Sequence, residues 1–449
     1  MKKNQILEVY VDDIKFPNIG LANVDNKTLQ IKGAIPKQKV KIKIEKSRRY
    51  KARLLEIIEK SPYEIEPKCP VFGICGGCQF QNIPYNYELE IKTSMVQNLL
   101  SPFYPATNFL ETMSVPNIEY YRNKMEFSFG DSGLSENGTS ELTLGMRKKG
   151  SFYEAVDANG CLLCHPDFSK ILSFTSQYFI KKGEHFYHRK TKKGNLRHLL
   201  IRRSSLGEVL VNLIVANYKD YNEYANELLC LNLAGSIKGI LLTTNLSEAD
   251  VVKPESVYTL FGVQHIMEEV CGLSFKISPF SFFQTNTMAA NVLYKKVLEL
   301  AGNINNKVVF DLYCGTGTIS QVFAKYAKKV IGIEIAKEAV ASAEESIKYN
   351  SIQNCEFIAG DVGEVIKNLN QKPDLIILDP PREGIRPKSI VNILKFNAKE
   401  IIYISCKPSS LALDLPHFLE AGYSIKNVQC IDMFARTANI ETVVLLCQS

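Results

Sequence analysis

The stretch IIYISCKP, residues 401–408, is a short, β-branched apolar run that ends in a cysteine and is followed closely by a proline. A run of this length and composition is typical of a strand buried on both faces of a parallel sheet. In open α/β sheets, ligands bind at the carboxyl ends of such strands. Cys406 therefore lies where a nucleophile would be displayed. The stretch by itself favours a buried structural thiol, and the rest of the sequence reverses that preference.

The chain around this stretch alternates between helix and strand from about residue 285. Apolar periodicity predicts helices at 288–301, 319–326, 337–349, 390–395 and 412–421, and strands at 307–312, 330–334, 375–379 and 401–405. Two last runs, 425–433 and 442–447, can pair as an antiparallel end. The alternation is typical of a doubly wound sheet with helices on both faces.

The chain has 449 residues, and this length predicts about three domains. Its 45% hydrophobic and 22% charged residues are ordinary for a soluble globular protein. No apolar run approaches the roughly 18 residues of a membrane span, and the first residues do not have the apolar core of a signal peptide. We therefore expect a cytoplasmic protein, in which cysteines serve as ligands, nucleophiles or core residues rather than disulfides.

Residues 1–60 form a basic module, with 15 Lys or Arg against 7 Asp or Glu, whereas residues 61–449 hold 39 against 40. Five short strand-like runs predict a small β-barrel, an architecture often used to bind oligonucleotides. In KVKIKIEK, residues 39–46, lysines alternate with Val or Ile and so share one face of a strand. The charge indicates contact with a polyanion, and a solvated charged surface is the alternative.

The middle of the chain, residues 61–270, begins with a proline-rich linker and a predicted helix at 85–100. From about residue 120 the pattern is mostly strands and turns. The segment 181–203 carries nine Lys or Arg against one Glu, which makes it a second candidate surface for phosphate groups.

A cofactor pocket is predicted where the strand 308–312 runs into YCGTGT, residues 313–318, and then a helix. Gly315 and Gly317 allow a tight turn and close approach of the backbone to a ligand. Glu334 ends the next strand, where an acid accepts hydrogen bonds from ribose hydroxyls. A glycine loop and acids that only shape turns are the alternative.

The identity of this cofactor is indicated by what surrounds the loop. The dinucleotide fingerprint requires a third glycine at position 320, and Ser320 stands there, which argues against a nicotinamide cofactor. Asp311 before the loop and Asp361 after a third strand suit S-adenosylmethionine instead, with Asp361 within reach of the adenine amino group.

The reaction centre is predicted from LDPPREG, residues 378–384, in which two prolines hold Asp379 on a rigid turn. An aromatic residue after Asp-Pro-Pro would indicate methylation of an exocyclic amine, but Arg382 follows here and a cysteine ends the neighbouring strand. This combination indicates a carbon atom as the methyl acceptor.

Methylation of uracil at C5 needs a specific set of side chains. C5 is a poor nucleophile until a thiolate adds at C6, and a base must afterwards remove the C5 proton. Cys406, Asp379 as an anchor for the uracil edge, and Glu441 can supply this set. A surface position at the start of a strand is the alternative for Glu441.

With these motifs in place, the chain resembles the RumA/TrmA-type RNA uracil-C5 methyltransferases over nearly its whole length, and specifically their iron–sulfur-containing ribosomal RNA members. The resemblance includes a TRAM-like N-terminal barrel and the stretches CPVFGICGGCQFQ, YNYELEIK, YRNKMEFSFG, SFFQTN, DLYCGTGT, LDPPREG, YISCKPSSL and DMFARTANIET.

The resemblance implies Cys406 as the nucleophile and Glu441 as the proton-abstracting base. It also implies a set of residues around S-adenosylmethionine and the target base: Gln284, Tyr313, Thr318, Glu334, Asp361 and Asp379.

The chain departs from the family at three positions. Family members usually carry Asn or Asp where Lys407 stands, Pro at Ala435 and often His at Asn439. We predict that Lys407 lowers the pKa of the Cys406 thiol, because a nearby cation favours the thiolate.

Cys69, Cys75 and Cys78 form a cluster whose spacing fits neither two zinc knuckles nor a ferredoxin run. The resemblance favours a [4Fe–4S] cluster with Cys161 as the fourth ligand. Cys164 is the alternative ligand and zinc the alternative metal. No electron transfer is needed for methylation, so a structural or RNA-facing role is expected.

The predicted fold is therefore α/β, with a Rossmann-like S-adenosylmethionine-dependent methyltransferase domain at 271–449. A TRAM-like, OB-type barrel at 1–60 and a mixed, strand-rich central domain with the iron–sulfur cluster at 61–270 precede it, and the helix 85–100 is a candidate to pack on the catalytic domain. The expected activity is formation of 5-methyluridine in 23S rRNA by a monomer. The alternatives are the T-loop uridine of tRNA, or a non-catalytic RNA-binding or assembly factor.

Overall fold

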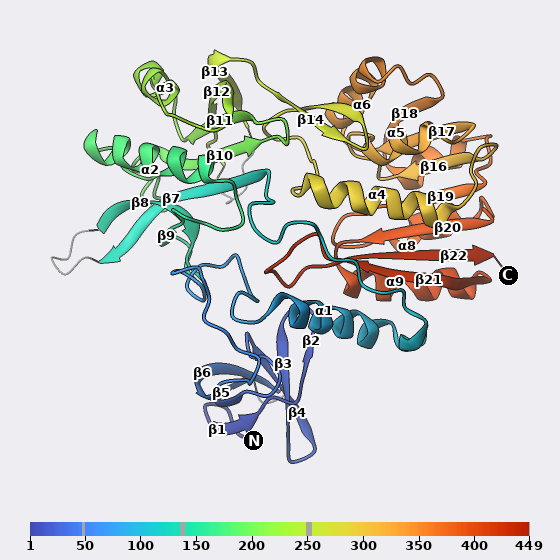
Figure 1. Ribbon diagram of the computed structural model, residues 1–449, viewed down its shortest axis with the longest axis horizontal. Coiled ribbons are helices and arrows are strands. Elements are labelled where there is room, and N and C mark those ends of the chain that lie inside the picture. Colours follow the sequence, from blue (N-terminus) through green and yellow to red (C-terminus); the bar gives the residue numbers. More distant parts are fainter. Residues whose placement is uncertain (47–49, 135–139, 248–253, 449) are drawn as a thin grey trace.

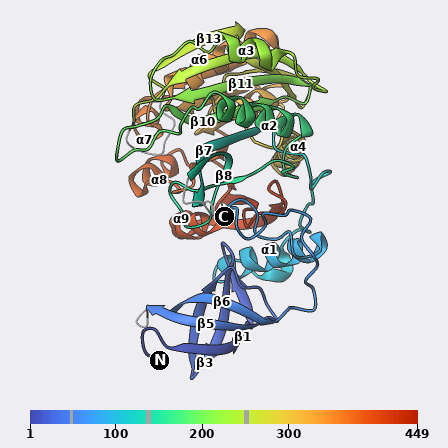
Figure 2. The same ribbon diagram turned by 90° about the vertical axis from the view of Figure 1, so that its left-hand side faces the viewer.

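The computed structural model describes residues 1–46, 50–134, 140–247 and 254–448. Figures 1 and 2 show an N-terminal barrel, a central sheet and a C-terminal sheet, with helix α1 (Tyr85–Leu100) between the barrel and the C-terminal sheet. No helix within these described ranges combines the length and the apolar character that crossing a membrane requires.

The N-terminal barrel is a six-stranded sheet in the order β1-β5-β6-β4-β3-β2. Val40, Ile42 and Ile44 of β5 are fully buried in its core, and the intervening lysines at 39, 41 and 43 are partly exposed. The predicted alternation is thus confirmed. The strands are β1 (Ile6–Tyr10), β2 (Asp13–Lys15), β3 (Ile19–Val24), β4 (Lys27–Lys32), β5 (Lys39–Lys46) and β6 (Lys51–Glu59).

The central sheet has seven strands in the order β13-β12-β11-β10-β7-β8-β9. Two helices pack on it that the sequence pattern did not predict, α2 (Pro166–Lys181) and α3 (Asn222–Leu229). The strands are β7 (Lys124–Leu134), β8 (Ser140–Arg147), β9 (Ala155–Asp157), β10 (Leu196–Arg203), β11 (Glu208–Val215), β12 (Ser236–Thr244) and β13 (Ser256–Gly262).

The prediction that all of 181–203 forms a phosphate-facing surface is wrong for its second half. Residues 196–203 are β10, a strand in the interior of the sheet. Arg197 and Arg202 are almost fully buried, where they donate to the carbonyl oxygens of Asn245 and Pro279. These guanidinium groups satisfy buried backbone oxygens and do not face solvent.

The C-terminal sheet has the order β18-β17-β16-β19-β20-β22-β21. Its first five strands are parallel, and β22 and β21 continue it in antiparallel pairs. The strands are β16 (Val308–Leu312), β17 (Lys329–Glu334), β18 (Cys355–Ala359), β19 (Leu375–Leu378), β20 (Glu400–Ser405), β21 (Tyr423–Ile431) and β22 (Glu441–Gln448). The strand order reverses at β16, so the crevice between β16 and β19 is the expected ligand site.

Both faces of this sheet are covered, because consecutive strand residues point to opposite sides. Ile402 packs into one apolar cluster, with α4 and α5, and Ile401 into the other, with α8 and α9. The predicted doubly wound α/β fold is confirmed. The helices are α4 (Thr287–Ala301), α5 (Thr318–Ala324), α6 (Lys337–Tyr349), α7 (Val362–Val365), α8 (Pro387–Leu394) and α9 (Pro408–Glu420).

Two smaller elements complete the fold. The hairpin of β14 (Ile266–Val270) and β15 (Leu273–Ile277) connects the central sheet to α4 (Figure 1). Helix α1 packs against α9, and its residues Val96 and Leu100 join the apolar cluster on that face of the C-terminal sheet. The division of the chain at residues 60 and 270 stays a prediction.

Candidate functional site

The glycine loop after β16 has the backbone geometry that its sequence predicts. Gly315 and Gly317 have φ of 55° and 72°, in the left-handed region that favours glycine. A Cβ at Gly317 would lie 2.4 Å from the ring of Phe357. Only glycine satisfies both conditions, so α5 begins directly after the loop and close to the sheet.

Glu334 at the end of β17 faces this loop. Its Oε2 accepts a hydrogen bond from the Gly315 N–H at 3.1 Å, and its Oε1 accepts one from Ala336 N–H at 2.9 Å. Thr318 is the first residue of α5, with its Oγ1 3.4 Å from that of Thr316. The structure therefore brings the predicted acid and the predicted hydroxyl to the same loop.

Tyr313 is the first residue of the glycine loop, and Asp361 follows β18, the strand beside β17. Tyr313 has φ of +70°, and burial raises the pKa of its phenol to about 12. Asp361 is in the wall of an open pocket of about 410 Å³ between α7 and α8, 3.6 Å from the guanidinium of Arg386. Apart from Gly363 and Val391, the residues that line this pocket are charged or polar, and none of them belongs to the glycine loop.

Two carboxyl groups with raised pKa values lie at the crevice between β16 and β19. Asp311 is fully buried; Ser320 donates to its Oδ2, and its Oδ1 has no hydrogen-bond partner among the described residues. Burial raises its pKa to about 7. Burial, together with the charge of Asp311, raises the pKa of Asp379 to about 7 as well. Such perturbed groups in a crevice indicate a functional site.

Gln284 lies in the segment 278–286 that precedes α4. Its backbone oxygen accepts a hydrogen bond from Asn123 Nδ2 at 2.8 Å, and its side chain is largely buried. In the same segment, Phe282 Cδ1 is 3.9 Å from the position that a Cβ would take at Gly315. Gln284 is therefore held near the glycine loop.

The pairing of β20 with β22 brings Cys406 and Glu441 together. Tyr403, Ile404 and Ser405 pair with Val444, Val443 and Thr442 in an antiparallel register. Continuing this register by one residue places Cys406 opposite Glu441. Residues that are opposite in antiparallel strands have Cα atoms about 4.5–5.5 Å apart. Two residues that are 35 positions apart in the chain thus meet at one strand end.

The thiol of Cys406 has a pKa raised to about 11, mainly by burial and then by the charges of Glu441 and Asp379. The cation that opposes this rise is Arg382, whose side chain also hydrogen-bonds the thiol. The prediction that Lys407 fills this role is not supported, because Lys407 is not among the groups that shift this pKa most. In the sequence, Arg382 is notable only because it replaces an aromatic residue after Asp-Pro-Pro. The LDPPREG motif does not indicate that its guanidinium lies beside the thiol.

Glu441 is buried, with 2% of its surface exposed, and its Oε2 accepts no hydrogen bond from the described residues. Burial, followed by the charge of Asp379, raises its pKa well above the ordinary value for a carboxyl. A buried carboxyl with one unpaired oxygen, beside a thiol and a second acid, has the properties expected of a proton acceptor.

The four predicted cysteine ligands, Cys69, Cys75, Cys78 and Cys161, line one small cavity. Cys164 is buried and does not line it; its thiol points to the Cys161 carbonyl oxygen at 3.6 Å. Within the described residues, no group of three or more His, Cys, Asp or Glu is arranged to hold a metal ion. The thiols therefore surround a cavity and do not converge on one point.

Hydrogen-bond donors and a cation surround these sulfur atoms. Gly77 N–H donates to Cys75 Sγ at 3.3 Å and Gln81 Nε2 donates to Cys78 Sγ at 3.2 Å. Arg122 is in the cavity wall, and its Nε has no hydrogen-bond partner in the described part of the chain. N–H···S contacts and a nearby cation fit an anionic group held by thiolates. The donor set is compatible with an iron–sulfur cluster.

The fold and this site define an S-adenosylmethionine-dependent methyltransferase with an N-terminal TRAM barrel. A profile for tRNA (uracil-5-)-methyltransferases matches residues 266–449, and one for the TRAM domain matches residues 2–53. An uncharacterized RNA methyltransferase of Clostridium acetobutylicum is 45% identical over 99% of this chain and 98% of its own length. One from Caldanaerobacter subterraneus is 40% identical over 99% of both chains. This chain belongs to the RumA/TrmA family of RNA (uracil-5-)-methyltransferases.

A solved structure shows the same fold over the full length. The tRNA (uracil-54, C5)-methyltransferase of Pyrococcus abyssi, in complex with S-adenosyl-L-homocysteine, matches with a TM-score of 0.77. The match covers 98% of this chain and 100% of that chain, at 22% sequence identity. The arrangement of barrel, central sheet and C-terminal sheet is thus shared with a known RNA methyltransferase.

Proposed function

We propose that this protein transfers a methyl group from S-adenosylmethionine to C5 of a uridine in 23S rRNA, through a covalent bond between Cys406 and C6. The observation that carries this proposal is the strand register that puts Cys406 opposite Glu441. A thiol and a buried carboxyl at one strand end are the two groups that this reaction needs on the protein.

The reaction balances with these residues. The Cys406 thiolate adds to C6, and the electron pair of the C5–C6 double bond moves so that C5 becomes a carbanion-like enolate carbon. C5 takes the methyl group from the sulfonium, which leaves as S-adenosylhomocysteine. The Glu441 carboxylate then removes the C5 proton, the double bond re-forms and the thiolate leaves.

Two further residues assist the reaction: Arg382 acts on the Cys406 thiol, and Asp379 acts on a carbonyl oxygen of the uracil. Arg382 opposes the high pKa of Cys406 and so raises the thiolate fraction. Asp379, with a pKa of about 7, is protonated in a large fraction of molecules near neutral pH. In that form it donates a hydrogen bond to a uracil carbonyl oxygen, which stabilises the enolate.

The cofactor would be held by residues around the glycine loop. Glu334 would accept hydrogen bonds from the ribose hydroxyls, and Asp361 would accept one from the adenine amino group. Tyr313 and Thr318 would line the rest of the cofactor site. Gln284 belongs to the same cofactor-binding set. The uridine must leave its RNA stack to reach Cys406, which single-stranded loops make easier.

The cysteine cavity would hold a [4Fe–4S] cluster through Cys69, Cys75, Cys78 and Cys161. The four thiols lining one cavity and the N–H donors to sulfur support this assignment. When bound, the cluster would tie residues 69–81 to the central sheet near Cys161. Methyl transfer requires no electron from it.

The choice of 23S rRNA rests on this cysteine set and on the basic barrel. The T-loop uridine of tRNA is the alternative substrate, and the family profile and the Pyrococcus enzyme are named for tRNA. We further propose that the protein acts in the cytoplasm as a monomer.

The test is incubation with labelled S-adenosylmethionine and with unmodified 23S rRNA or unmodified tRNA, followed by mapping of the label. The expected product is 5-methyluridine in 23S rRNA only. Label in tRNA alone would establish the alternative substrate. No transfer to either RNA would favour a non-catalytic RNA-binding role, and transfer by a Cys406→Ala variant would contradict the covalent mechanism.

A further inference from the structure

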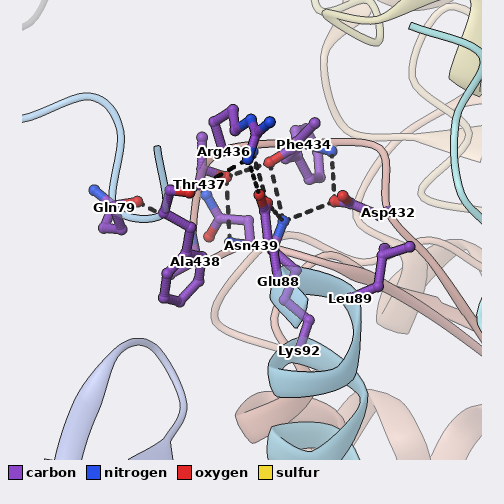
Figure 3. Close-up of polar contacts among 12 residues, drawn as sticks. Gln79, Glu88, Leu89, Lys92, Asp432, Phe434, Arg436, Thr437, Ala438 and Asn439 are labelled. Atoms are coloured by element: carbon purple, nitrogen blue, oxygen red, sulfur yellow. Dashed lines mark hydrogen bonds and ion pairs between the residues drawn. The ribbon is translucent and has the colours of Figure 1, made fainter. Parts of the chain in front are cut away.

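A buried group of charges joins α1 to the segment before Glu441. The side chains of Glu88, Lys92 and Asp432 are fully buried. Lys92 Nζ lies 2.7 Å from Glu88 Oε1 and 2.8 Å from Asp432 Oδ1, and Arg436 Nη1 lies 3.4 Å from Glu88 Oε2 (Figure 3). Two carboxylates face two cations, so the group is balanced. Lys92 and Asp432 are 340 residues apart in the chain.

This group binds the backbone of residues 432–440, which connect β21 to β22. The Arg436 N–H donates to Glu88 Oε1 at 2.6 Å, and Lys92 Nζ donates to the Phe434 carbonyl oxygen at 3.2 Å. Arg436 has φ of +68°, a strained conformation for a residue with a side chain. The contacts with α1 therefore hold a backbone shape that this residue does not prefer.

The segment that follows the cysteine cluster binds the same connection. The backbone N–H of Gln79 donates to the Arg436 carbonyl oxygen at 2.8 Å, and Ala438 N–H donates to Gln79 Oε1 at 2.9 Å. On the other side, Tyr121 Oη and Asn286 Nδ2 donate to the carbonyl oxygens of residues 435 and 433, at 2.9 and 3.1 Å. The connection 432–440 is thus held from several segments distant in sequence.

Glu441 comes directly after this connection, and one of its carboxylate oxygens, Oε2, has no hydrogen-bond partner among the described residues. Its position therefore depends on where β22 begins. Cys406, by contrast, directly follows β20, which is held inside the sheet by parallel pairing with β19 and antiparallel pairing with β22. A shift of the connection 432–440 would therefore move Glu441 more than Cys406.

We propose that Glu88 is a positioning residue for Glu441, and that it acts with Gln79 through the connection 432–440. This inference rests on the proposed function. It assigns to YNYELEIK and to the residue after Cys78 a role in the step that removes the C5 proton. Loss of Glu88 or Gln79 should slow that step and leave the addition of Cys406 to C6 nearly unchanged.

The test compares Glu88→Gln and Gln79→Ala with the wild-type enzyme, assayed with RNA whose target uridine carries hydrogen or deuterium at C5. A carboxylate moved by about 1 Å should lower kcat by about 10- to 100-fold, with KM for RNA and for S-adenosylmethionine unchanged. The methylated protein–RNA adduct should accumulate as a complex stable to denaturant. A primary deuterium isotope effect on kcat should also appear.

A second readout isolates the earlier step. RNA with 5-fluorouridine has no removable C5 proton, so its adduct forms without the base. Both variants should form this adduct at the wild-type rate. Glu441→Gln serves as the positive control for accumulation of the methylated adduct. Glu223→Gln serves as the matched control, because it breaks an exposed carboxylate–lysine pair with Lys182 in the central domain.

The outcomes separate this inference from the proposed function. If the wild-type enzyme forms no adduct with 5-fluorouridine RNA, the proposed function fails. If Glu88→Gln slows adduct formation and turnover equally, the network supports the fold alone and the inference is wrong. Should Glu88→Gln not fold, Gln79→Ala removes only neutral hydrogen bonds and decides the question. Unchanged kcat without an isotope effect in Gln79→Ala would then overturn the proposal.

Discussion

Cys406 illustrates how single neighbours set the chemistry of a residue in this protein. Burial and two carboxylates raise the pKa of its thiol, whereas the guanidinium of Arg382 lowers it. The resulting value of about 11 leaves little thiolate at neutral pH in the absence of RNA. A low resting reactivity protects the thiol from oxidation until a substrate is bound.

At the residue scale, this balance predicts the pH dependence of Cys406 alkylation. Because only the thiolate reacts, the alkylation rate should rise with pH up to about 11. Replacing Arg382 by Met removes the cation that lowers the pKa, so the pKa rises and alkylation at pH 8 to 9 slows, by about tenfold for each unit.

The measurement is iodoacetamide labelling of the Cys406 peptide, followed by mass spectrometry across a pH series. Lys407→Met is the matched control, because it removes a cation one residue away from the same thiol. A larger shift in Lys407→Met than in Arg382→Met would restore the role predicted for Lys407 from the sequence.

At the scale of elements, the loop from β16 to α5 shows why glycine is required at one position and only convenient at others. Gly317 combines φ of +72° with contact to the Phe357 ring, whereas Gly150 has φ of +81° with open space where a Cβ would lie. The two positions therefore separate the cost of backbone strain from the cost of a packing clash.

Gly317→Ala should lower the free energy of unfolding by more than Gly150→Ala. Backbone strain costs roughly 1–2 kcal/mol at both positions, and overpacking adds about 1–3 kcal/mol at Gly317 alone. Urea unfolding of both variants measures the difference. Titration with S-adenosylmethionine should show weaker binding for Gly317→Ala only. Equal effects at the two positions would contradict the packing argument.

Helix α1 shows how one element connects distant parts of the chain. Its apolar residues join the C-terminal core, and its Lys92 pairs with both Glu88 and Asp432. Breaking a buried ion pair by removing one partner leaves an uncompensated charge, which costs more than the intact pair contributes.

Lys92→Met should therefore lower the free energy of unfolding by about 3–5 kcal/mol. Lys182→Met is the control, because its partner Glu223 is exposed and such pairs contribute about 0–1 kcal/mol. Denaturant unfolding monitored by circular dichroism measures both. Similar midpoints for the two variants would show that the buried charges contribute no more than a surface pair.

At the scale of the whole molecule, three segments far apart in the sequence meet around the connection 432–440. Gln79 and Phe80 follow the proposed ligand Cys78, α1 carries the buried charges, and the SFFQTN segment ends at the cap of α4. The segment that follows Cys78 is therefore bonded through Gln79 to the connection that precedes Glu441. The cysteine cavity and the Glu441 region are thus connected by structural contacts, and no chemical step links them.

Removal of the proposed cluster should loosen both regions. Protein purified without oxygen should be coloured and contain iron and sulfide in equal amounts. Oxidative loss of the cluster followed by chelation should increase amide hydrogen exchange in residues 69–81 and 432–440, while the barrel strands at 6–32 remain unchanged as an internal control. A colourless preparation that holds zinc, or exchange confined to residues 69–81, would contradict this coupling.

The sequence by itself determined the doubly wound sheet, the glycine loop and the strand-end position of Cys406. Those features follow from local periodicity and turn chemistry, which a window of about 10–20 residues contains. The helices at 85–100 and 337–349 have the bounds that their patterns predicted. Glu334 contacts the glycine loop, and Asp361 follows β18 at the same edge of the sheet, because the carboxyl ends of parallel strands share one edge.

Only the tertiary structure decided which distant segments meet. The register of β22 on β20 brings Glu441 to Cys406, and the buried charges of α1 bind the connection before Glu441. The burial of Arg197 and Arg202 and the place of Arg382 beside the thiol are likewise set by packing. Local patterns record propensity, whereas these contacts arise from the mutual fit of segments hundreds of residues apart, which no local window contains.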